Sequence, residues 1–194
     1  MKTLYTPYNY TVSAFSSGPP SSPSTGDIWV GTGVDTLGTR WQFQYNAGSA
    51  STYKWEFIGG LPAWTHYDYP GGLSIGLSTY TPITNCSFTI IRAGDYIFTG
   101  EAEVNGGTTG SPELIVALSQ NSTTGPVTGG WGTAYFGFPT FTNSASNPTM
   151  KIMGSYRFDG AAVNDIFRLL AWSNGATSNT VAFGRFSMIP ARII

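Results

Sequence analysis

Charged residues and cysteine are both scarce in this sequence. Only 10% of its 194 residues are charged, the net charge is −1, and there is one cysteine. Soluble proteins usually carry about a quarter charged residues. No cluster of lysine or arginine provides the electrostatic surface that nucleic acid or an anionic membrane needs. A surface of Ser, Thr, Asn and Gly is instead typical of a protein that packs into a large assembly or works outside the cell.

The absence of certain segments excludes further classes. A lone cysteine, Cys86, excludes an internal disulfide and a multi-cysteine metal site, and we expect it to be a small buried hydrophobe. Residues 1–10 lack the apolar run of a signal peptide, and no segment reaches the ~20 apolar residues of a membrane helix. The sequence therefore predicts a soluble, unsecreted protein with no membrane partner.

Residues for catalysis are also few. His66 is the only histidine, and with Asp68 it supplies at most two of the three or four ligands of a metal site. Glu101 and Glu103 share one face of a predicted strand, which is compatible with a carboxylate pair of a glycosidase but also with ordinary solvent-facing glutamates. No phosphate loop or Ser-His-Asp arrangement is legible. We expect a protein that is not an enzyme, with no catalytic, metal or cofactor-binding residues and no cofactor.

Aromatic residues, at 15%, are abundant and patterned. Two triplets alternate with polar residues: Trp41, Phe43 and Tyr45, then Tyr53, Trp55 and Phe57. A period of two places each triplet on one face of a strand. Small turn-forming residues fill positions 46–52, so the pattern predicts a β-hairpin. A short strand at 27–30 is expected to pair with it.

The region around this hairpin resembles a known module. Residues 18–30 read GPPSSPSTGDIWV, and residues 53–60 read YKWEFIGG. Over residues 18–62 the chain resembles a module of bacteriophage virion proteins, mainly minor tail and fibre-like proteins of phages that infect actinobacteria. The resemblance implies a particle component located in the virion and made in the host bacterial cytoplasm. It carries no catalytic motif.

After residue 62 the composition changes. Short apolar segments recur between Gly-, Asn- and Pro-rich turns, at 72–80, 87–91, 95–104, 113–119, 133–141, 150–158, 165–172 and 180–189. This spacing predicts a β-sandwich. We therefore expect an all-β chain with an N-terminal arm (1–17), a small aromatic β-hairpin module (18–62) and a jelly-roll-like β-sandwich (63–194).

A second resemblance supports that fold class. Residues 94–98 give a Gly-x-Tyr-x-Phe strand, and 162–172 and 183–189 follow as closing strands. Together they resemble the jelly-roll heads of complement and tumour-necrosis-factor-type trimers. A fold of this kind implies no activity by itself.

The same region predicts self-association. Segments 166–172 and 135–141 carry apolar residues on both alternating faces, so something should cover the second face. We expect a homotrimer that uses Phe136, Phe138, Phe141 and Trp172. The alternative is that a loop or the 1–62 module covers this face within one chain.

Two functions remain open from the sequence. The first is a structural virion protein whose partners are itself and other virion proteins, either tail-associated and able to contact the host surface or a capsid decoration or head fibre protein. The second is a carbohydrate-binding module that uses exposed aromatics against host-surface sugars, with Trp131, Tyr135 and Tyr69 as candidates. Aromatics of all-β proteins also serve as core residues, which is the simpler interpretation of these three.

Overall fold

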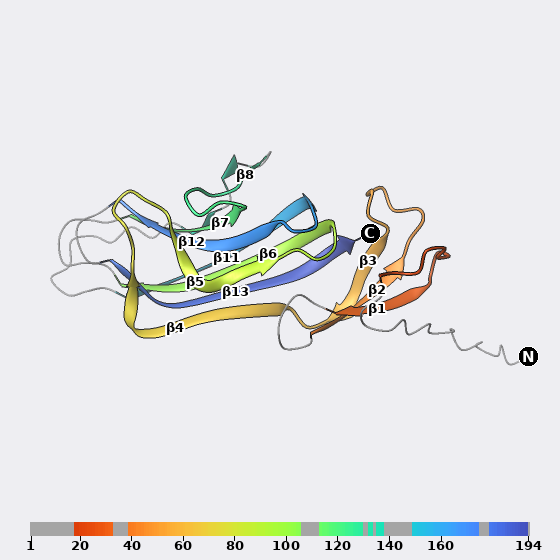
Figure 1. Cartoon of the computed structure of the whole chain (residues 1–194), viewed down its shortest axis with the longest axis horizontal. Coiled ribbons are helices and arrows are strands. Elements are labelled where there is room, and N and C mark those ends of the chain that lie inside the picture. The colour runs from red at the N-terminus through yellow and green to blue at the C-terminus, as the bar shows by residue number, and fades with distance from the viewer. Residues whose placement is uncertain are drawn as a thin grey trace, which may run out of the picture.

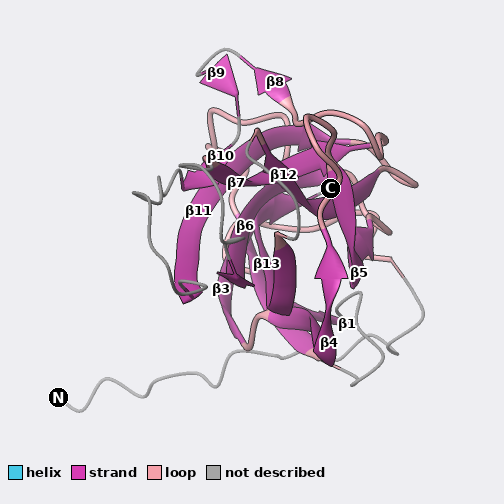
Figure 2. Ribbon diagram, turned by 90° about the vertical axis from the view of Figure 1, so that its left-hand side faces the viewer, coloured by secondary structure: helices cyan, strands magenta, loops and turns pink. Residues whose placement is uncertain are grey.

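The computed structural model describes residues 18–32, 39–105, 113–129, 132–133, 135–137, 149–174 and 179–193. Within these ranges every regular element is a β-strand (Figures 1 and 2). The strands are β1 (Ile28–Thr32), β2 (Arg40–Tyr45), β3 (Trp55–Gly60), β4 (Ala63–Ser74), β5 (Thr81–Thr89), β6 (Gly94–Asn105), β7 (Leu114–Gln120), β8 (Thr128–Gly129), β9 (Gly132–Thr133), β10 (Tyr135–Gly137), β11 (Thr149–Ala161), β12 (Ile166–Ser173) and β13 (Thr180–Ile193).

Two antiparallel sheets form the body of the molecule. The larger has the order β1-β2-β3-β13-β6-β11, with β4 also paired to β13. The smaller has the order β10-β7-β12-β5. In Figure 1 β4, β6, β11 and β13 run along the long axis, and β1–β3 lie at one end of it. The end-on view in Figure 2 shows the strands curling around a common interior.

The hydrophobic core lies between the two sheets. Phe98 of the large sheet stacks on Phe167 of the small sheet, with ring centroids 4.4 Å apart, and on Phe186 at 5.6 Å. At Gly100 an added Cβ would lie 2.6 Å from both Phe136 and Leu169, so glycine lets the sheets approach closely here. Alternate residues of β6 and β13 face this core. The expected all-β, jelly-roll-like sandwich is confirmed.

The aromatic hairpin is also present. β2 pairs with β3, and β1 pairs with β2 in the predicted place. Trp29 stacks on Phe43 at 5.3 Å and meets Trp55 edge-on at 6.0 Å. Trp29, Trp41, Phe43 and Trp55 are at most 3% exposed. Rings of this size bury enough apolar area to hold three short strands together.

This aromatic unit is joined to the sandwich. β3 pairs with the end of β13 through Glu56↔Arg192 and Trp55↔Ile193. Arg92, in the connection between β5 and β6, lies over the Trp29 ring at 4.7 Å. One hydrophobic cluster includes the aromatic unit and the sandwich interior. β4 begins at Ala63, where the sequence suggested a boundary, but the division into separate domains stays a prediction.

The strand predicted at 72–80 is only partly correct. Residues 72–74 belong to β4 (Ala63–Ser74), whereas residues 75–80 form a connection with an isolated bridge from Leu77 to Ser173 and with Ser78 at φ 53°. The rest of β4 was missed because its outward residues Trp64, His66 and Asp68 alternate with inward residues that are only partly apolar. The N-terminal arm (1–17) lies outside the described residues.

Candidate functional site

A groove opens where the two parts of the large sheet separate. β3 follows β13 only at Trp55 and Glu56, whereas β4 joins the same edge of β13 from Ala63, opposite Met188. Leu61 and Pro62 make the step between the two strands. Because β3 leaves the sheet before β4 begins, the edge is interrupted at this point.

The connection is held in place from the buried side. Trp41 Nε1 donates a 2.9 Å hydrogen bond to the carbonyl oxygen of Leu61. Gly60 has φ +123°, and an added Cβ would lie 2.4 Å from the Arg40 carbonyl oxygen. The turn into Leu61 therefore requires glycine at residue 60. Leu61 itself is 76% exposed.

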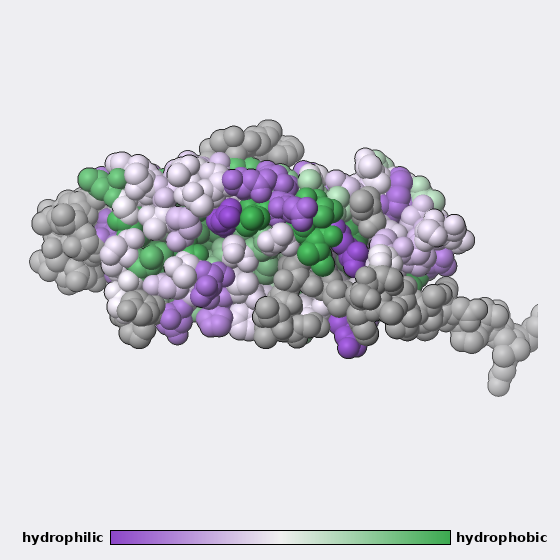
Figure 3. All heavy atoms as spheres, viewed as in Figure 1, coloured by the Kyte–Doolittle hydropathy of each residue, from purple (hydrophilic) through white to green (hydrophobic). Residues whose placement is uncertain are grey.

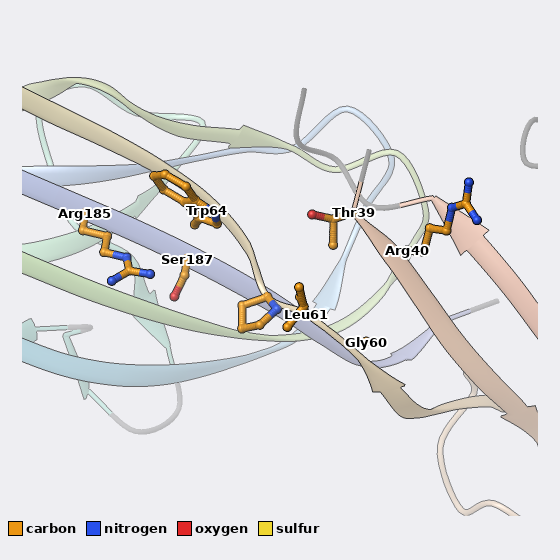
Figure 4. A pocket seen from close by; sticks show the side chains of 8 residues that line it. Thr39, Arg40, Gly60, Leu61, Trp64, Arg185 and Ser187 are labelled. Atoms are coloured by element: carbon orange, nitrogen blue, oxygen red, sulfur yellow. The ribbon is translucent and has the colours of Figure 1, made fainter. Parts of the chain in front are cut away.

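The groove has a volume of about 550 Å³. This lies within the usual range of ligand-binding pockets. Trp64, Arg185 and Ser187 form one side, and Thr39 and Arg40 approach from the start of β2 (Figure 4). The lining residues are Thr39, Arg40, Gly60, Leu61, Pro62, Trp64, Arg185 and Ser187. We call this the Trp64 groove.

Trp64 is the large aromatic residue of this groove. It is 37% exposed, unlike the tryptophans of the aromatic unit. The Arg185 guanidinium lies 5.5 Å from its ring centroid, and the His66 ring lies 5.2 Å away. In the sheet Ser187 pairs with Trp64, and Arg185 pairs with His66. Arg185 and His66 therefore lie side by side, two residues from the Ser187–Trp64 pair along β13 and β4 and on the side away from Pro62.

An acidic depression lies next to the groove. Asp68, Glu101, Glu103 and Lys151 line it, and Arg185 is shared between the two. Lys151 Nζ lies 3.8 Å from Glu101 Oε1. The two glutamates thus occupy an open, solvent-facing sheet surface, with Glu101 ion-paired. Among the described residues no group of three His, Cys, Asp or Glu side chains is placed to hold a metal ion.

The surroundings of Cys86 and His66 indicate packing roles for both side chains. Cys86 is fully buried, and burial raises the pKa of its thiol to about 12. The thiol is therefore unreactive at neutral pH. His66 is exposed and contacts Trp64. No helix with the length and hydropathy of a membrane span occurs in the described part of the chain.

The aromatic residues proposed for sugar binding fall in different places. Trp131 lies outside the described residues, and only the backbone of Tyr69, in β4, is described. Tyr135 is half-buried, and its hydroxyl lies 3.3 Å from that of Tyr80. The Tyr80 ring in turn lies 6.2 Å from Trp172. Burial, with the contact to Tyr135, raises the pKa of Tyr80.

The proposed interface residues are also separated. Phe136 is 6% exposed and belongs to the core, where it packs near Gly100 and Gly154. Trp172 is half-buried beside Tyr80. Phe138 and Phe141 lie outside the described residues.

The second face of the small sheet is covered within a single chain, and the interface itself stays a prediction. The second face of the small sheet carries Ile115, Ala117 and Leu170, whose neighbours in β7 and β12 point into the core. These three are 7%, 0% and 0% exposed in a single chain. The chain covers this face by itself, as the alternative interpretation anticipated, so the face does not require a second copy.

Sequence reasoning did not identify the Trp64 groove. Its lining comes from residues 39–40, 60–64 and 185–187, which only the sheet pairing brings together. The available signal was the alternation of Trp64, His66 and Asp68, which places an aromatic and two polar residues on one outward face.

Comparisons with known proteins assign the chain to no family. No protein-family model and no curated protein matches it. Among solved structures it is similar to murine APRIL at pH 5.0 (9% identity, TM-score 0.37, 66% of this chain and 100% of the other). It is also similar to rabbit GITRL (18% identity, TM-score 0.29, 59% of this chain and 79% of the other). A third similar structure is that of the infectious bursal disease virus Gx strain (8% identity, TM-score 0.36, 89% of this chain and 44% of the other). The chain spans less than half the length of the viral chain.

Proposed function

We propose that the chain is a non-enzymatic structural component of a bacteriophage virion, and specifically a tail-associated minor tail or fibre-like protein. The observation that carries this proposal is the stretch 18–62, which resembles a phage virion module in sequence. In the structure its strands form a buried aromatic unit that continues the large sheet through β3 and β13. Such a unit supports a building role because its aromatic side chains are buried against one another and against the sandwich.

The surface is consistent with assembly rather than chemistry. Charged residues are few, and the paired glutamates Glu101 and Glu103 lie in an open depression beside Lys151. Paired-carboxylate catalysis needs two groups across a cleft that encloses the substrate. An assay against host-envelope polysaccharide should therefore show no turnover. Turnover that disappears in Glu101→Gln or Glu103→Gln would contradict the non-enzymatic role.

A capsid decoration or head fibre protein is the second candidate. The single sandwich, without a shaft-like repeat in its sequence, favours this location. Electron cryomicroscopy of the intact phage that encodes the chain distinguishes the two: density for the sandwich on the tail supports the first, and density on the head supports the second. Particles that lack the chain altogether would end both proposals.

Self-association as a homotrimer remains part of the proposal. Exposed large apolar residues are separated in the fold: Leu77 (64%) lies in the connection between β4 and β5, and Met153 (70%) lies in β11. On the face shown in Figure 3, hydrophobic residues form separate areas among hydrophilic ones. A trimer would thus use a mixed surface and dissociate at low concentration. Light scattering over a concentration series that starts below micromolar tests it, and a mass near one chain at every concentration would exclude it.

A further inference from the structure

We propose that the Trp64 groove binds an acidic saccharide, a sugar that carries a carboxylate or phosphate group. The inference goes beyond the virion role and does not rest on it. It rests on an exposed tryptophan and on the cations around it.

The indole of Trp64 provides a stacking surface. Tryptophan side chains are mostly buried in folded proteins, yet Trp64 is 37% exposed and lines a groove. Arg185 and His66 contact it from the row of the sheet that lies away from Pro62. Trp64 and Arg185 both line the groove, so the indole and the guanidinium that contacts it are presented to a ligand together. The apolar face of a sugar ring suits such a flat aromatic surface.

The charge of the groove itself favours an anion, and the carboxylates of Asp68, Glu101 and Glu103 lie in the adjoining depression, which Arg185 also borders. Arg40 and Arg185 line it, and no carboxylate is among its described lining residues. A guanidinium presents a planar fork of donors that matches a carboxylate or phosphate.

Arg185 is oriented for this role. Its cross-strand neighbour on β6 is Glu101, but Glu101 forms its ion pair with Lys151 at 3.8 Å. The Arg185 guanidinium lies over Trp64 instead. One arginine thus borders both the aromatic surface and the groove, as Figure 4 shows.

Polar groups beside the cations complete the site. Thr39 and Ser187 also line the groove and carry hydroxyl groups that can donate to or accept from sugar hydroxyls. Leu61 and Pro62 add apolar surface between them. An acidic peptide would use the arginines but not the flat indole, so the saccharide is the better match.

Calorimetric titration tests the proposal with three probes. Tetragalacturonic acid and glucose 6-phosphate supply a carboxylate and a phosphate, and maltotetraose is the neutral probe. We expect the wild type to bind at least one acidic probe more tightly than maltotetraose, and to bind it less tightly as salt rises. Trp64→Ala should weaken binding of that probe about tenfold or more, whereas Trp64→Tyr should retain part of it.

Variants of Arg185 separate charge from stacking. Arg185→Gln should remove the preference for the acidic probe, about tenfold, and Arg185→Lys should keep part of it. Arg168→Gln removes a positive charge from β12 of the small sheet, outside the groove, and should leave affinity unchanged. Trp64 and Arg185 are exposed, so their variants should melt close to the wild type.

Several results would overturn the inference. They are the absence of binding to both acidic probes at millimolar concentration, equal affinity for acidic and neutral probes, and binding that Trp64→Ala leaves intact. Equal binding of tetraglutamate would show that the groove recognises acidic peptides rather than saccharides.

Discussion

Trp41 and Leu61 are linked by a hydrogen bond from the indole nitrogen of a buried residue to the backbone carbonyl oxygen of an exposed one. Trp41 is 2% exposed and Leu61 is 76% exposed. The core of the aromatic unit therefore sets the position of the connection that borders the Trp64 groove. Stability of the unit and geometry of the groove are coupled through this bond.

Truncation of the aromatic unit should be costly. Trp41→Ala and Trp55→Ala should each lower the free energy of unfolding by about 3–5 kcal/mol, because each removes a buried indole and leaves a cavity. Trp41→Phe keeps a ring but loses the bond to Leu61, so its loss should be smaller. Chemical denaturation measures all three. An alanine variant that melts within a degree or two of the wild type would show that the unit is peripheral.

Gly60 should not tolerate a side chain. Its φ is +123°, and a Cβ would lie 2.4 Å from the Arg40 carbonyl oxygen, so Gly60→Ala should destabilise the protein by more than about 1 kcal/mol. Gly125→Ala is the matched control, because a Cβ there meets nothing within 4 Å. Equal melting temperatures of the two variants would contradict the strained turn.

Asp95 joins three strands and the aromatic unit. Its carboxylate accepts from the Gly160 amide at 3.0 Å and lies within 4 Å of Arg157 and Arg192, and Arg192 also pairs with Glu56. The Asp95 side chain is 7% exposed, so Asp95→Asn should cost about 1–3 kcal/mol. Asp159→Asn removes an exposed partner of Arg157 and should cost less than about 1 kcal/mol. Urea titration of both variants tests the difference, and similar losses would refute it.

Asp165 should make stability depend on acid pH. Burial opposes its ionisation, but hydrogen bonds from Asn121, the Ala162 amide and Gln120 outweigh burial and hold its pKa below the usual 3.8. A carboxyl with a lowered folded-state pKa stabilises the fold above its unfolded pKa, and this contribution is lost as pH falls through the folded value. Asp165→Asn should therefore be less stable than the wild type at pH 7, and the gap should narrow below about pH 4. A gap that stays constant from pH 7 to pH 3 would argue against this role.

The parts of the fold that depend on local pattern were predictable. Trp41 and Phe43 alternate with polar residues within a few positions, which is sufficient to indicate a strand and its buried face. The sandwich followed in the same way from the spacing of apolar segments. The strand at Ala63–Ser74 is not evident from the sequence, because His66 and Asp68 make its pattern of apolar residues too weak to indicate a strand.

The candidate site was not predictable in this way. Trp64 and Arg185 are far apart in sequence, and only the pairing of β4 with β13 places them together. The apolar alternation of 166–172 likewise did not reveal that Leu170 is covered within the chain. The sequence pattern shows which apolar side chains must be buried, but the long-range pairing of strands determines which segment buries them.

The pairing of β13 has a consequence for synthesis on the ribosome. β3, β4 and β6 all form ladders with β13, which is the last strand of the described chain. Until β13 leaves the exit tunnel, the edges of these strands that face β13 have no ladder partner, and contacts of such long sequence separation form slowly. The aromatic unit is therefore translated early but can dock only late, so the nascent chain must be kept from aggregating during most of its elongation.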